Sequence, residues 1–351
     1  MEVYLAFYFL LNILSCLSFI KLAYKRSLFL LTSLAIMVLL ATFRGPQVGT
    51  DLPMYLDYYN SMGANLGEVL DYRMELGYAL LNYIVYWTTG SETIFLFLVA
   101  LITYSILIFF FYKCSYNPVY SVIIFIGMFI YCMSYNAIRQ YLAVAFLCLA
   151  YYLIQRNSNK MYILLCLIIA TLFHKTAIIM LPVFALERYF NNFKKYIVIM
   201  ILTIASWMII VSGGYEVVYT LIPQYAVYET LAYSKSREIT ASILLPIVTL
   251  AYIFASSIYL FVNKKEFDKK ISYYNFLMLL YSLLWIASFK IFIFYRFVYY
   301  FDIFICIIIP YIVEKKFKQQ FAVYTILSVP MFLYLFLNLS RNTAMVVPYL
   351  S

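Results

Sequence analysis

The sequence predicts an all-α protein that crosses a membrane many times. Of the 351 residues, 66% are hydrophobic and only 11% are charged, whereas soluble domains carry charge on about a quarter of their residues. Apolar runs of about 17 to 22 residues recur along the chain, and this length lets a helix cross a hydrocarbon core of about 30 Å. The alternating ten-residue segments typical of a β-barrel do not occur.

The apolar runs give the expected helices in order. They cover residues 3–20, 27–43, 93–112, 118–134, 137–155, 159–173, 176–187, 195–212, 241–262, 272–289, 297–313 and 321–339. We therefore expect about 12 transmembrane helices in one polytopic domain over 1–351. The runs 159–173 and 176–187 are short, so ten spans plus a re-entrant pair is the alternative, because a polar break at membrane depth is tolerated where it lines a cavity. The shorter segment 76–90 predicts an interfacial or re-entrant helix.

Basic residues orient these helices. Most of the 25 lysines and arginines lie in short loops between the apolar runs, and such loops remain on the cytoplasmic side of a membrane. These loop residues are Lys21, Lys25, Arg26, Lys113, Arg156, Lys160, Arg188, Lys194, Lys195, Lys264, Lys265, Lys269, Lys270, Lys315, Lys316 and Lys318. The orientation places the loops at about 44–92 and 213–240 outside. The net charge of +10 then reflects topology, and we expect no nucleic-acid partner.

Ionisable residues near the outer boundary are the most informative about function. They are Arg44, Asp51, Glu75, Arg139, His174, Lys175, Lys290 and Arg296. A charge at bilayer depth costs a few kcal/mol, so it normally faces a cavity. Arg139 and Arg296 stand at the outer starts of two runs, where helix dipoles favour anions and the guanidinium fork suits phosphate. An anionic ligand at the outer leaflet is therefore expected.

Each of these residues also has a structural interpretation that the sequence leaves open. The arginines are able to reach the lipid headgroups from a helix end. Asp51 is a candidate turn or helix cap for the run that follows it, and Glu75 is a candidate partner of Arg73 or Arg44. His174 stands in a broken span, where a structural role and a catalytic role are equally open. The tyrosines of the outer loops suit either a membrane-interface belt or stacking against sugars.

Several short motifs together resemble the EpsG family of Wzy-like polysaccharide polymerases. The matching pieces, in order, are RGPQVGTD at 44–51 with Tyr55, ELGY at 75–78, NAIRQ at 136–140, FHKTA at 173–177, Tyr295-Arg296 and Pro348-Tyr349. The resemblance implies a multi-pass enzyme of the bacterial cytoplasmic membrane, similar to the C-type glycosyltransferases. Such an enzyme makes O-antigen, capsule or exopolysaccharide by moving a growing glycan from undecaprenyl diphosphate to a new lipid-linked unit, on the outer face. The lipid-linked donor and acceptor, the bilayer and a chain-length regulator are the partners implied.

Glycosyl transfer of this kind requires a base for the acceptor hydroxyl and cations for the departing diphosphate. We expect Glu75 or Asp51 to be the base, and favour Glu75 because burial at the start of an apolar helix would raise its pKa. Arg139 and Arg296 are expected to bind the diphosphate. The further candidates for the site are His174 and, for contact with diphosphate or sugar, Arg44, Lys175, Gln140, Tyr55, Tyr78 and Tyr295.

No metal or other cofactor is expected. The six cysteines have no C-x-x-C spacing and the chain has a single histidine, so neither a disulfide framework nor a transition-metal site is indicated. A D-x-D motif is absent, and the E-x-D at 266–268 lies in a lysine-rich loop on the cytoplasmic side. These features favour a metal-independent transferase.

Two other functions compete with this one. A ligase that moves finished glycan to another acceptor would need the same chemistry, and the sequence alone separates it poorly from a polymerase. A flippase or transporter of lipid-linked oligosaccharide would need polar groups along both halves of its path, often with internal repeats. The polar groups concentrate on one side and no repeat is present, so the polymerase is the favoured hypothesis.

Overall fold

The computed structural model describes residues 1–350 apart from 19–22, 64–73, 215–243, 264–266 and 290–292. Within these residues every regular element is a helix, and no strand is present. The all-α prediction is therefore confirmed for the described part of the chain. Contacts divide the chain into two compact units, Met1–Ile178 with Ile305–Ser351, and Ile179–Phe304. The predicted outer loop at about 213–240 lies almost wholly outside the described residues.

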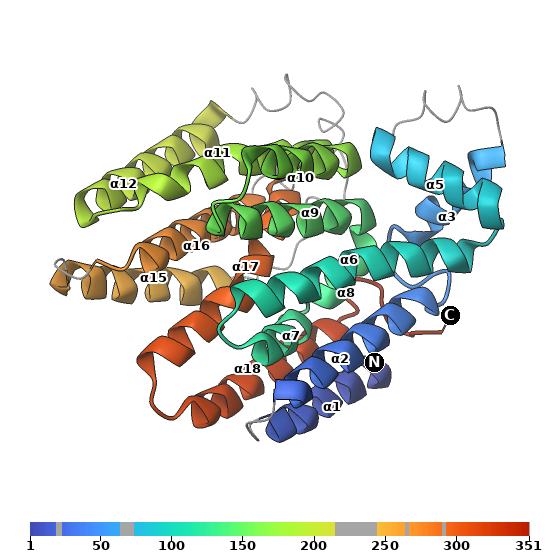
Figure 1. Ribbon diagram of the computed structural model, residues 1–351, viewed down its shortest axis with the longest axis horizontal. Coiled ribbons are helices and arrows are strands. Elements are labelled where there is room, and N and C mark those ends of the chain that lie inside the picture. Colours follow the sequence, from blue (N-terminus) through green and yellow to red (C-terminus); the bar gives the residue numbers. More distant parts are fainter. Residues whose placement is uncertain (19–22, 64–73, 215–243, 264–266, 290–292, 351) are drawn as a thin grey trace. The chain divides into compact units, whose positions relative to one another are not determined.

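The first unit contains most of the helices (Figure 1). These are α1 (Glu2–Ser18), α2 (Ala23–Thr42), α3 (Leu52–Asn60), α5 (Leu76–Thr89), α6 (Glu92–Cys114), α7 (Pro118–Gly127), α8 (Ile130–Asn136), α9 (Ile138–Gln155), α10 (Lys160–Phe173), the second half of α17 (Ile293–Lys316) and α18 (Gln320–Ser340). Short 3-10 helices follow α3 at Ser61–Gly63 and α10 at Lys175–Ile179. The helix expected at 76–90 is α5, and its predicted place at the membrane interface stays a prediction.

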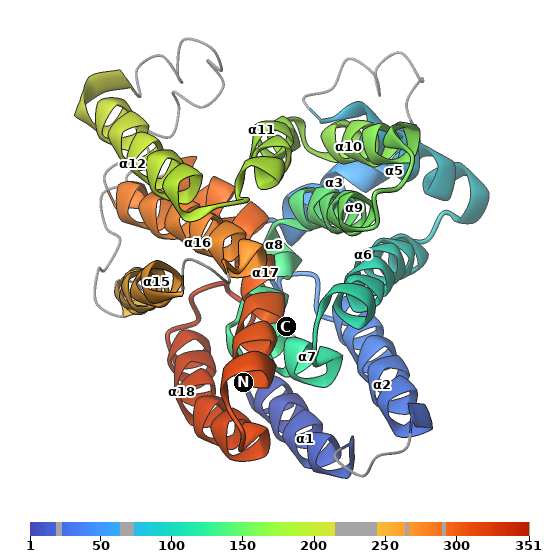
Figure 2. The same ribbon diagram turned by 60° about the vertical axis from the view of Figure 1, so that its left-hand side comes forward.

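The second unit consists of α11 (Met180–Leu186), α12 (Phe193–Ile209), α15 (Leu244–Val262), α16 (Lys269–Ser288) and the first half of α17. Helices α15 and α16 lie side by side (Figure 2). The Ser256 hydroxyl donates to Asn275 Oδ1 at 2.9 Å between them. Phe190, which precedes α12, packs its ring against Phe276 of α16 with centroids 5.2 Å apart.

Local sequence signals explain where several helices begin and end. The Ser91 hydroxyl caps α6 by accepting from Ile94 N, and the Asn159 side chain caps α10 by accepting from Met161 N at 2.9 Å. These caps satisfy backbone N–H groups that have no partner within the helix. Gly90 ends α5 with φ of +63°, the left-handed conformation that glycine adopts at low cost.

One predicted span is broken. The apolar run 118–134 was expected to form a single helix, but α7 and α8 are bent by 60° at the residues between them. Phe129 has φ of +63° at this break, which is a strained conformation for a residue with a side chain. The run is apolar throughout, so composition gives no warning of the bend. The short helix α8, which follows the bend, ends three residues before Arg139 in the sequence.

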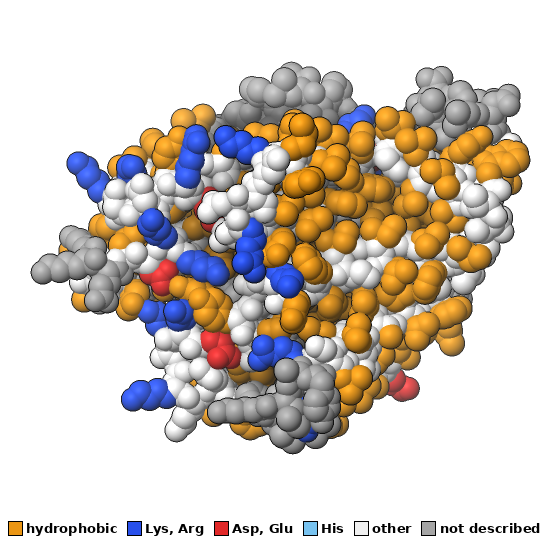
Figure 3. Space-filling view, viewed as in Figure 1, with side chains coloured by type: hydrophobic (Ala, Val, Ile, Leu, Met, Phe, Trp, Pro, Cys, Tyr) orange, Lys and Arg blue, Asp and Glu red, His pale blue; other side chains and the backbone are white. Residues whose placement is uncertain are grey.

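The described residues contain seven helices long and apolar enough to cross a membrane, or eight if α7 and α8 count as one span. Three shorter apolar helices, Glu2–Cys16, Lys160–Phe173 and Pro246–Val262, accompany them. Many side chains on α2 and α10 are apolar and exposed, including Leu28, Leu31, Met161 and Leu165, and apolar side chains cover these helices in Figure 3. The protein is a polytopic membrane protein, and the predicted total of about 12 spans is not confirmed.

Helices α2, α6 and α9 each have one end at the site. Ala41, near the end of α2, lines the same pocket as Leu96, near the start of α6, so these two helices run antiparallel. Ile138 of α9 lines that pocket as well, and at the other end Phe109 of α6 packs against Tyr152 of α9 with ring centroids 5.2 Å apart. Helices α6 and α9 are therefore parallel. The motif residues of the first unit gather at the end where α2 stops and α6 and α9 begin.

The C-terminal segment 341–350 docks on the loop that follows α2. Gly45 N donates to Tyr349 O at 3.0 Å, and Gly49 N donates to Met345 O at 2.8 Å. These backbone hydrogen bonds hold the first motif, 44–51, against the last one, 348–349. Residues about 300 positions apart in the chain therefore form one structure beside the start of α9.

Asn136 joins this structure to the break between α8 and α9. Its Oδ1 accepts from Thr50 N at 2.9 Å, and its Nδ2 donates to Ala344 O at 3.0 Å. A Cβ on Gly49 would lie 2.6 Å from the same Oδ1. Glycine at 49 is thus required by a positive φ and by the close approach of Asn136.

We expect Gly49→Ala to destabilise the protein by about 1–3 kcal/mol through backbone strain, with a further contribution from the clash with Asn136. Gly90→Ala is the matched control, because Gly90 has φ of +63° but nothing within 4 Å of its Cβ position. The control is expected to lose only about 1 kcal/mol. The measurement is the free energy of unfolding of both purified variants in detergent. Equal losses in the two variants would contradict the role given to Asn136.

Candidate active site

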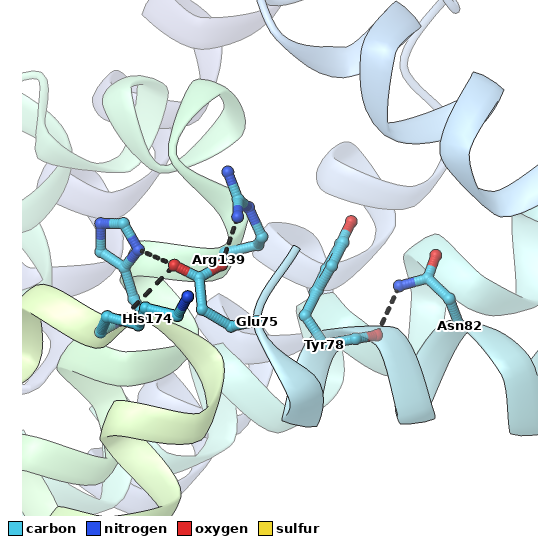
Figure 4. Close-up of polar contacts among 6 residues, drawn as sticks. Glu75, Tyr78, Asn82, Arg139 and His174 are labelled. Atoms are coloured by element: carbon cyan, nitrogen blue, oxygen red, sulfur yellow. Dashed lines mark hydrogen bonds and ion pairs between the residues drawn. The ribbon is translucent and has the colours of Figure 1, made fainter. Parts of the chain in front are cut away.

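Three ionisable residues from three distant parts of the first unit meet at one point. The Arg139 Nη1 donates to Glu75 Oε2 in an ion pair. The His174 Nδ1 lies 2.9 Å from the other carboxylate oxygen, Oε1, and the backbone N of Lys175 donates to Oε1 at 3.4 Å. Figure 4 shows Glu75 between the side chains of Arg139 and His174. All three residues were predicted as site residues, but their pairing was not.

Each of these side chains stands at a helix end. Glu75 occupies the N-cap position of α5, Arg139 is the second residue of α9, and His174 is the C-cap of α10. The interior of a transmembrane helix disfavours charge, whereas its ends lie next to polar backbone groups. The three ends come together because α10 packs against both α9 and α5.

Gly77 sets the distance between α5 and α10. A Cβ at this position would lie 2.9 Å from the backbone oxygen of Leu172, and a backbone atom has little freedom to move away. Leu172 lies two residues before His174, and Gly77 lies two residues after Glu75. The absence of a side chain at Gly77 therefore allows the carboxylate and the imidazole to meet.

Two predicted site tyrosines surround the guanidinium of Arg139. Its Cζ lies 5.7 Å from the ring centroid of Tyr55 and 5.9 Å from that of Tyr78, within the range of cation–π attraction. Both rings are buried in an aromatic cluster that also contains Tyr58, Tyr59 and Phe95. Their predicted contact with a sugar stays a prediction. In the structure both rings pack beside Arg139, and Figure 4 shows Tyr78 of the two.

The electrostatics of Glu75 differ from the prediction. Burial raises the pKa of Glu75, but the hydrogen bond with His174 and the charge of Arg139 outweigh burial and lower it from the ordinary 4.5 to about 2. Burial alone predicts a raised pKa for Glu75, and this prediction is wrong. The candidate pairing of Glu75 with Arg44 is also wrong, and Arg73 lies outside the described residues. At neutral pH Glu75 is a carboxylate held by two partners.

The other predicted residues of the first unit lie around this cluster. Asp51 stands at the N-cap position of α3 but makes no capping hydrogen bond with its side chain, and instead accepts from the Thr50 hydroxyl at 2.9 Å. Gln140 is buried on α9, and the Lys175 side chain is exposed. Arg44 is buried, and its Cζ lies 4.3 Å from the ring centroid of Tyr135.

Tyr295 and Arg296 lie on the first half of α17, in the second unit. Tyr295 packs against Trp285 and Tyr299, with ring centroids 5.3 and 5.1 Å away. Arg296 is the fourth residue of α17, as expected for a residue at a helix start. Their predicted role in the site stays a prediction. Lys290 lies outside the described residues.

The sequence analysis missed two residues. Asn136 organises the loop at 44–51, and Tyr135 supplies the ring beneath Arg44. Asn136 belongs to the motif at 136–140, so its polar side chain in an apolar run was a usable signal. Tyr135 is one of 39 tyrosines and carried no distinguishing signal.

Comparison with known proteins identifies the family. The model of the EpsG family matches residues 27–351, nearly the whole chain, including the motifs that meet around Glu75. The chain belongs to the EpsG family. This membership suggests a role like that of a polysaccharide polymerase. No curated protein and no solved structure gives a significant match.

Because the pKa of Glu75 is lower in the folded protein, its ionisation stabilises the EpsG-family fold above pH 4.5, and this stabilisation is lost as pH falls toward 2. We expect Glu75→Gln to lose about 3–5 kcal/mol at pH 7, since Arg139 is left buried without a counter-ion. The measurement is the free energy of unfolding of the wild type and of the variant between pH 7 and pH 2.5. The difference between these two free energies should shrink as the pH approaches 2.5.

Glu2→Gln is the control for this experiment, because Glu2 is an exposed carboxylate at the start of α1. Its effect should stay within about 0.5 kcal/mol at every pH. A Glu75→Gln variant as stable as the wild type at pH 7 would refute the ion-pair account.

Proposed function

We propose that this protein polymerises undecaprenyl-diphosphate-linked oligosaccharide repeats on the outer face of the cytoplasmic membrane. The growing glycan would be transferred from its lipid carrier to the non-reducing end of a new lipid-linked unit, without a metal ion. The observation that supports this most is the buried cluster of Glu75, Arg139 and His174 at the converging ends of α5, α9 and α10. Family membership supports the same chemistry.

The distribution of basic residues supports the outward orientation. Lys113 is in the last turn of α6, Arg156 follows α9, and Lys160 begins α10. These three residues lie at the helix ends opposite to the cluster around Glu75. Since basic loops remain in the cytoplasm, the cluster would face outward. There it would meet lipid-linked glycan presented on the outer leaflet.

The reaction requires a proton acceptor and a stabilised leaving group. The acceptor hydroxyl oxygen forms a bond with the anomeric carbon of the donor glycan, and the bond from that carbon to the diphosphate oxygen breaks. The hydroxyl proton moves to a base, and the electron pair of the broken bond stays on the diphosphate. A positioned base and a nearby cation each lower the barrier to such a step.

His174 is better suited than Glu75 to be this base. A carboxylate with a pKa near 2 accepts a proton poorly at neutral pH, whereas the most effective base has a pKa near the working pH. Because ionised Glu75 only accepts hydrogen bonds, the Nδ1 of His174 donates to it at 2.9 Å. The lone pair of the neutral imidazole is then on Nε2. Glu75 thus sets the tautomer and orientation of the base.

Arg139 would stabilise the negative charge of the departing diphosphate. Its Nη1 binds Glu75, while its Nε has no hydrogen-bond partner among the described residues. A guanidinium has five N–H donors in a planar fork, so pairing with one carboxylate leaves capacity for phosphate oxygens. Its pairing with Glu75 also keeps that carboxylate ionised when His174 gains a proton.

We expect His174→Ala and Arg139→Ala to lower polymerisation at least a hundredfold. Single lipid-linked units should accumulate while the protein remains in the membrane. Asp51→Asn should retain most activity, because Asp51 contacts Thr50 and not the cluster. The measurement is glycan chain length in cells and with a purified lipid-linked repeat. Arg296→Ala, examined alongside, tests whether the second unit contributes a cation.

Arg156→Gln is the matched control, since it removes an exposed arginine from the opposite end of α9. Normal chain length in the His174→Ala and Arg139→Ala variants would refute the proposal. Loss of activity in Asp51→Asn with activity retained in His174→Ala would move the base to Asp51.

The proposed topology is tested with cysteines introduced one at a time into a background in which all six native cysteines are replaced by serine. Asn60→Cys, at the exposed end of α3, should react with an impermeant maleimide added to whole cells. Asn157→Cys, exposed beyond the end of α9, should react only after the cells are broken. The reverse pattern would place the cluster in the cytoplasm and refute the outward-facing site.

A further inference from the structure

The start of α9 lacks the local cap that usually fixes the beginning of a helix. Helix α8 ends at Asn136 and α9 begins at Ile138, so Ala137 alone separates them. Ala137 has ψ of +47°, far from the helical value of about −42°. Serine, threonine, aspartate or asparagine commonly caps a helix at this position, and alanine has no side-chain group that could do so. The direction of the first turn of α9 therefore depends on contacts that neighbouring residues make.

Asn136, the residue before this break, is held on both sides of its amide. Its Oδ1 accepts from Thr50 N at 2.9 Å, and its Nδ2 donates to Ala344 O at 3.0 Å. These partners lie 86 and 208 positions away in the chain. Asn136 is only 7% exposed, and leaving a buried amide without such partners would be costly. The side chain thus ties the end of α8 to two distant backbone segments.

The C-terminal segment that contains Ala344 is itself fixed. Ala344 is fully buried. The turn around it is closed by Asn342, whose side chain accepts from Val347 N at 2.9 Å and donates to Val347 O at 2.6 Å. The Tyr349 hydroxyl donates to a backbone oxygen near the end of α2 at 3.0 Å. The segment is therefore a firm support for Asn136.

The first turn of α9 carries Arg139, which lies three residues after Asn136. The guanidinium of Arg139 forms the ion pair with Glu75, and its Cζ lies 5.7 Å from the ring centroid of Tyr55. A rotation of this turn would move the whole side chain, because the direction of a side chain follows its backbone. A misplacement of about 1 Å is able to cost about a hundredfold in rate. The break at Ala137 is therefore close enough to the proposed site to affect its chemistry.

Helix packing is the competing explanation for the position of Arg139. Helix α9 also packs against α6 and α10, and Phe146 of α9 stacks on Phe173 of α10 with ring centroids 5.8 Å apart. If this packing were sufficient, Asn136 would contribute only to stability, whatever residue stood at 139. The two explanations differ in one measurable respect, which is whether the effects of Asn136 and of the ion pair are independent.

We propose that Asn136 is a positioning residue that holds the first turn of α9 so that Arg139 meets Glu75, with the segment 341–350 as its support. Asn136 contacts neither Glu75 nor the reacting groups in this role. It acts through the backbone of the break that follows it. The kinetic part of this inference rests on the proposed polymerase function, and the structural part does not.

The first test needs no polymerisation. It measures the unfolding equilibrium constant in detergent for Asn136→Ala, for Glu75→Gln and for the double variant. If Asn136 holds Arg139 on Glu75, both single variants lose part of the same ion pair. The combined effect should then fall at least tenfold short of the product of the single effects.

Asn117→Ala is the matched control for this cycle. It removes an amide that donates to Glu314 Oε1 at 2.9 Å, beyond the opposite end of α6. Because this amide has no part in the ion pair, its effect and that of Glu75→Gln should multiply to within twofold. If Asn136→Ala does not accumulate in the membrane, Asn136→Asp takes its place, since an ionised carboxylate still accepts from Thr50 N but cannot donate to Ala344 O.

The second test measures kcat/KM with a purified lipid-linked repeat. Asn136→Ala should lower kcat/KM at least tenfold, because it displaces the guanidinium that would stabilise the leaving group. In an Arg139→Ala background the same change should lower it less than twofold further, because the group that Asn136 positions is already gone. A purely structural role would lower kcat/KM equally in both backgrounds. Asn117→Ala should change it less than twofold.

Independent effects of Asn136→Ala and Glu75→Gln on unfolding would overturn the positioning role. Coupled unfolding with independent effects on kcat/KM would overturn its part in the reaction. Coupled unfolding in a protein that makes no polymer keeps the structural part of the inference and loses the proposed function. Polymer formation with independent effects in both cycles keeps the proposed function and loses this inference.

Discussion

The carboxylate of Glu75 is the interaction on which the rest of the site depends. It binds Arg139 through one oxygen and His174 through the other, and so joins the ends of α5, α9 and α10. Removing it would leave a buried guanidinium without a counter-ion, at a cost of several kcal/mol. It also decides which imidazole nitrogen carries the proton. One residue therefore determines both how the three helices meet and what His174 is able to do.

Arg44, which is buried, and Arg139, which is partly buried, show how two arginines come to have different partners. Arg139 is neutralised by Glu75 and packed between Tyr55 and Tyr78. Arg44 is supported by Tyr135 alone and opens to a pocket with an apolar wall. Arg139 would be suited to charge that develops during the reaction.

The loop 44–51 and the Glu75 cluster are held by different contacts. The loop 44–51, Asn136 and the C-terminal segment form one hydrogen-bonded structure beside the start of α9. This structure holds Arg44, while α5 and α10 hold the Glu75 cluster on the other side of the same helix end. Membrane helices have little polar surface to fix a loop, so backbone hydrogen bonds to the chain terminus serve this purpose.

The sequence by itself determined the helical class and most helix positions, and it singled out Glu75, Arg139 and His174, because apolar runs and rare ionisable residues are visible in the sequence. It also carried the family motifs. Only the tertiary structure decided the pairing of those charges. The lowered pKa of Glu75 depends on Arg139 and His174, which lie 64 and 99 positions away, and the sequence contains no signal for their distance. The bend between α7 and α8 was likewise hidden, since an apolar run has the same composition whether it is straight or broken.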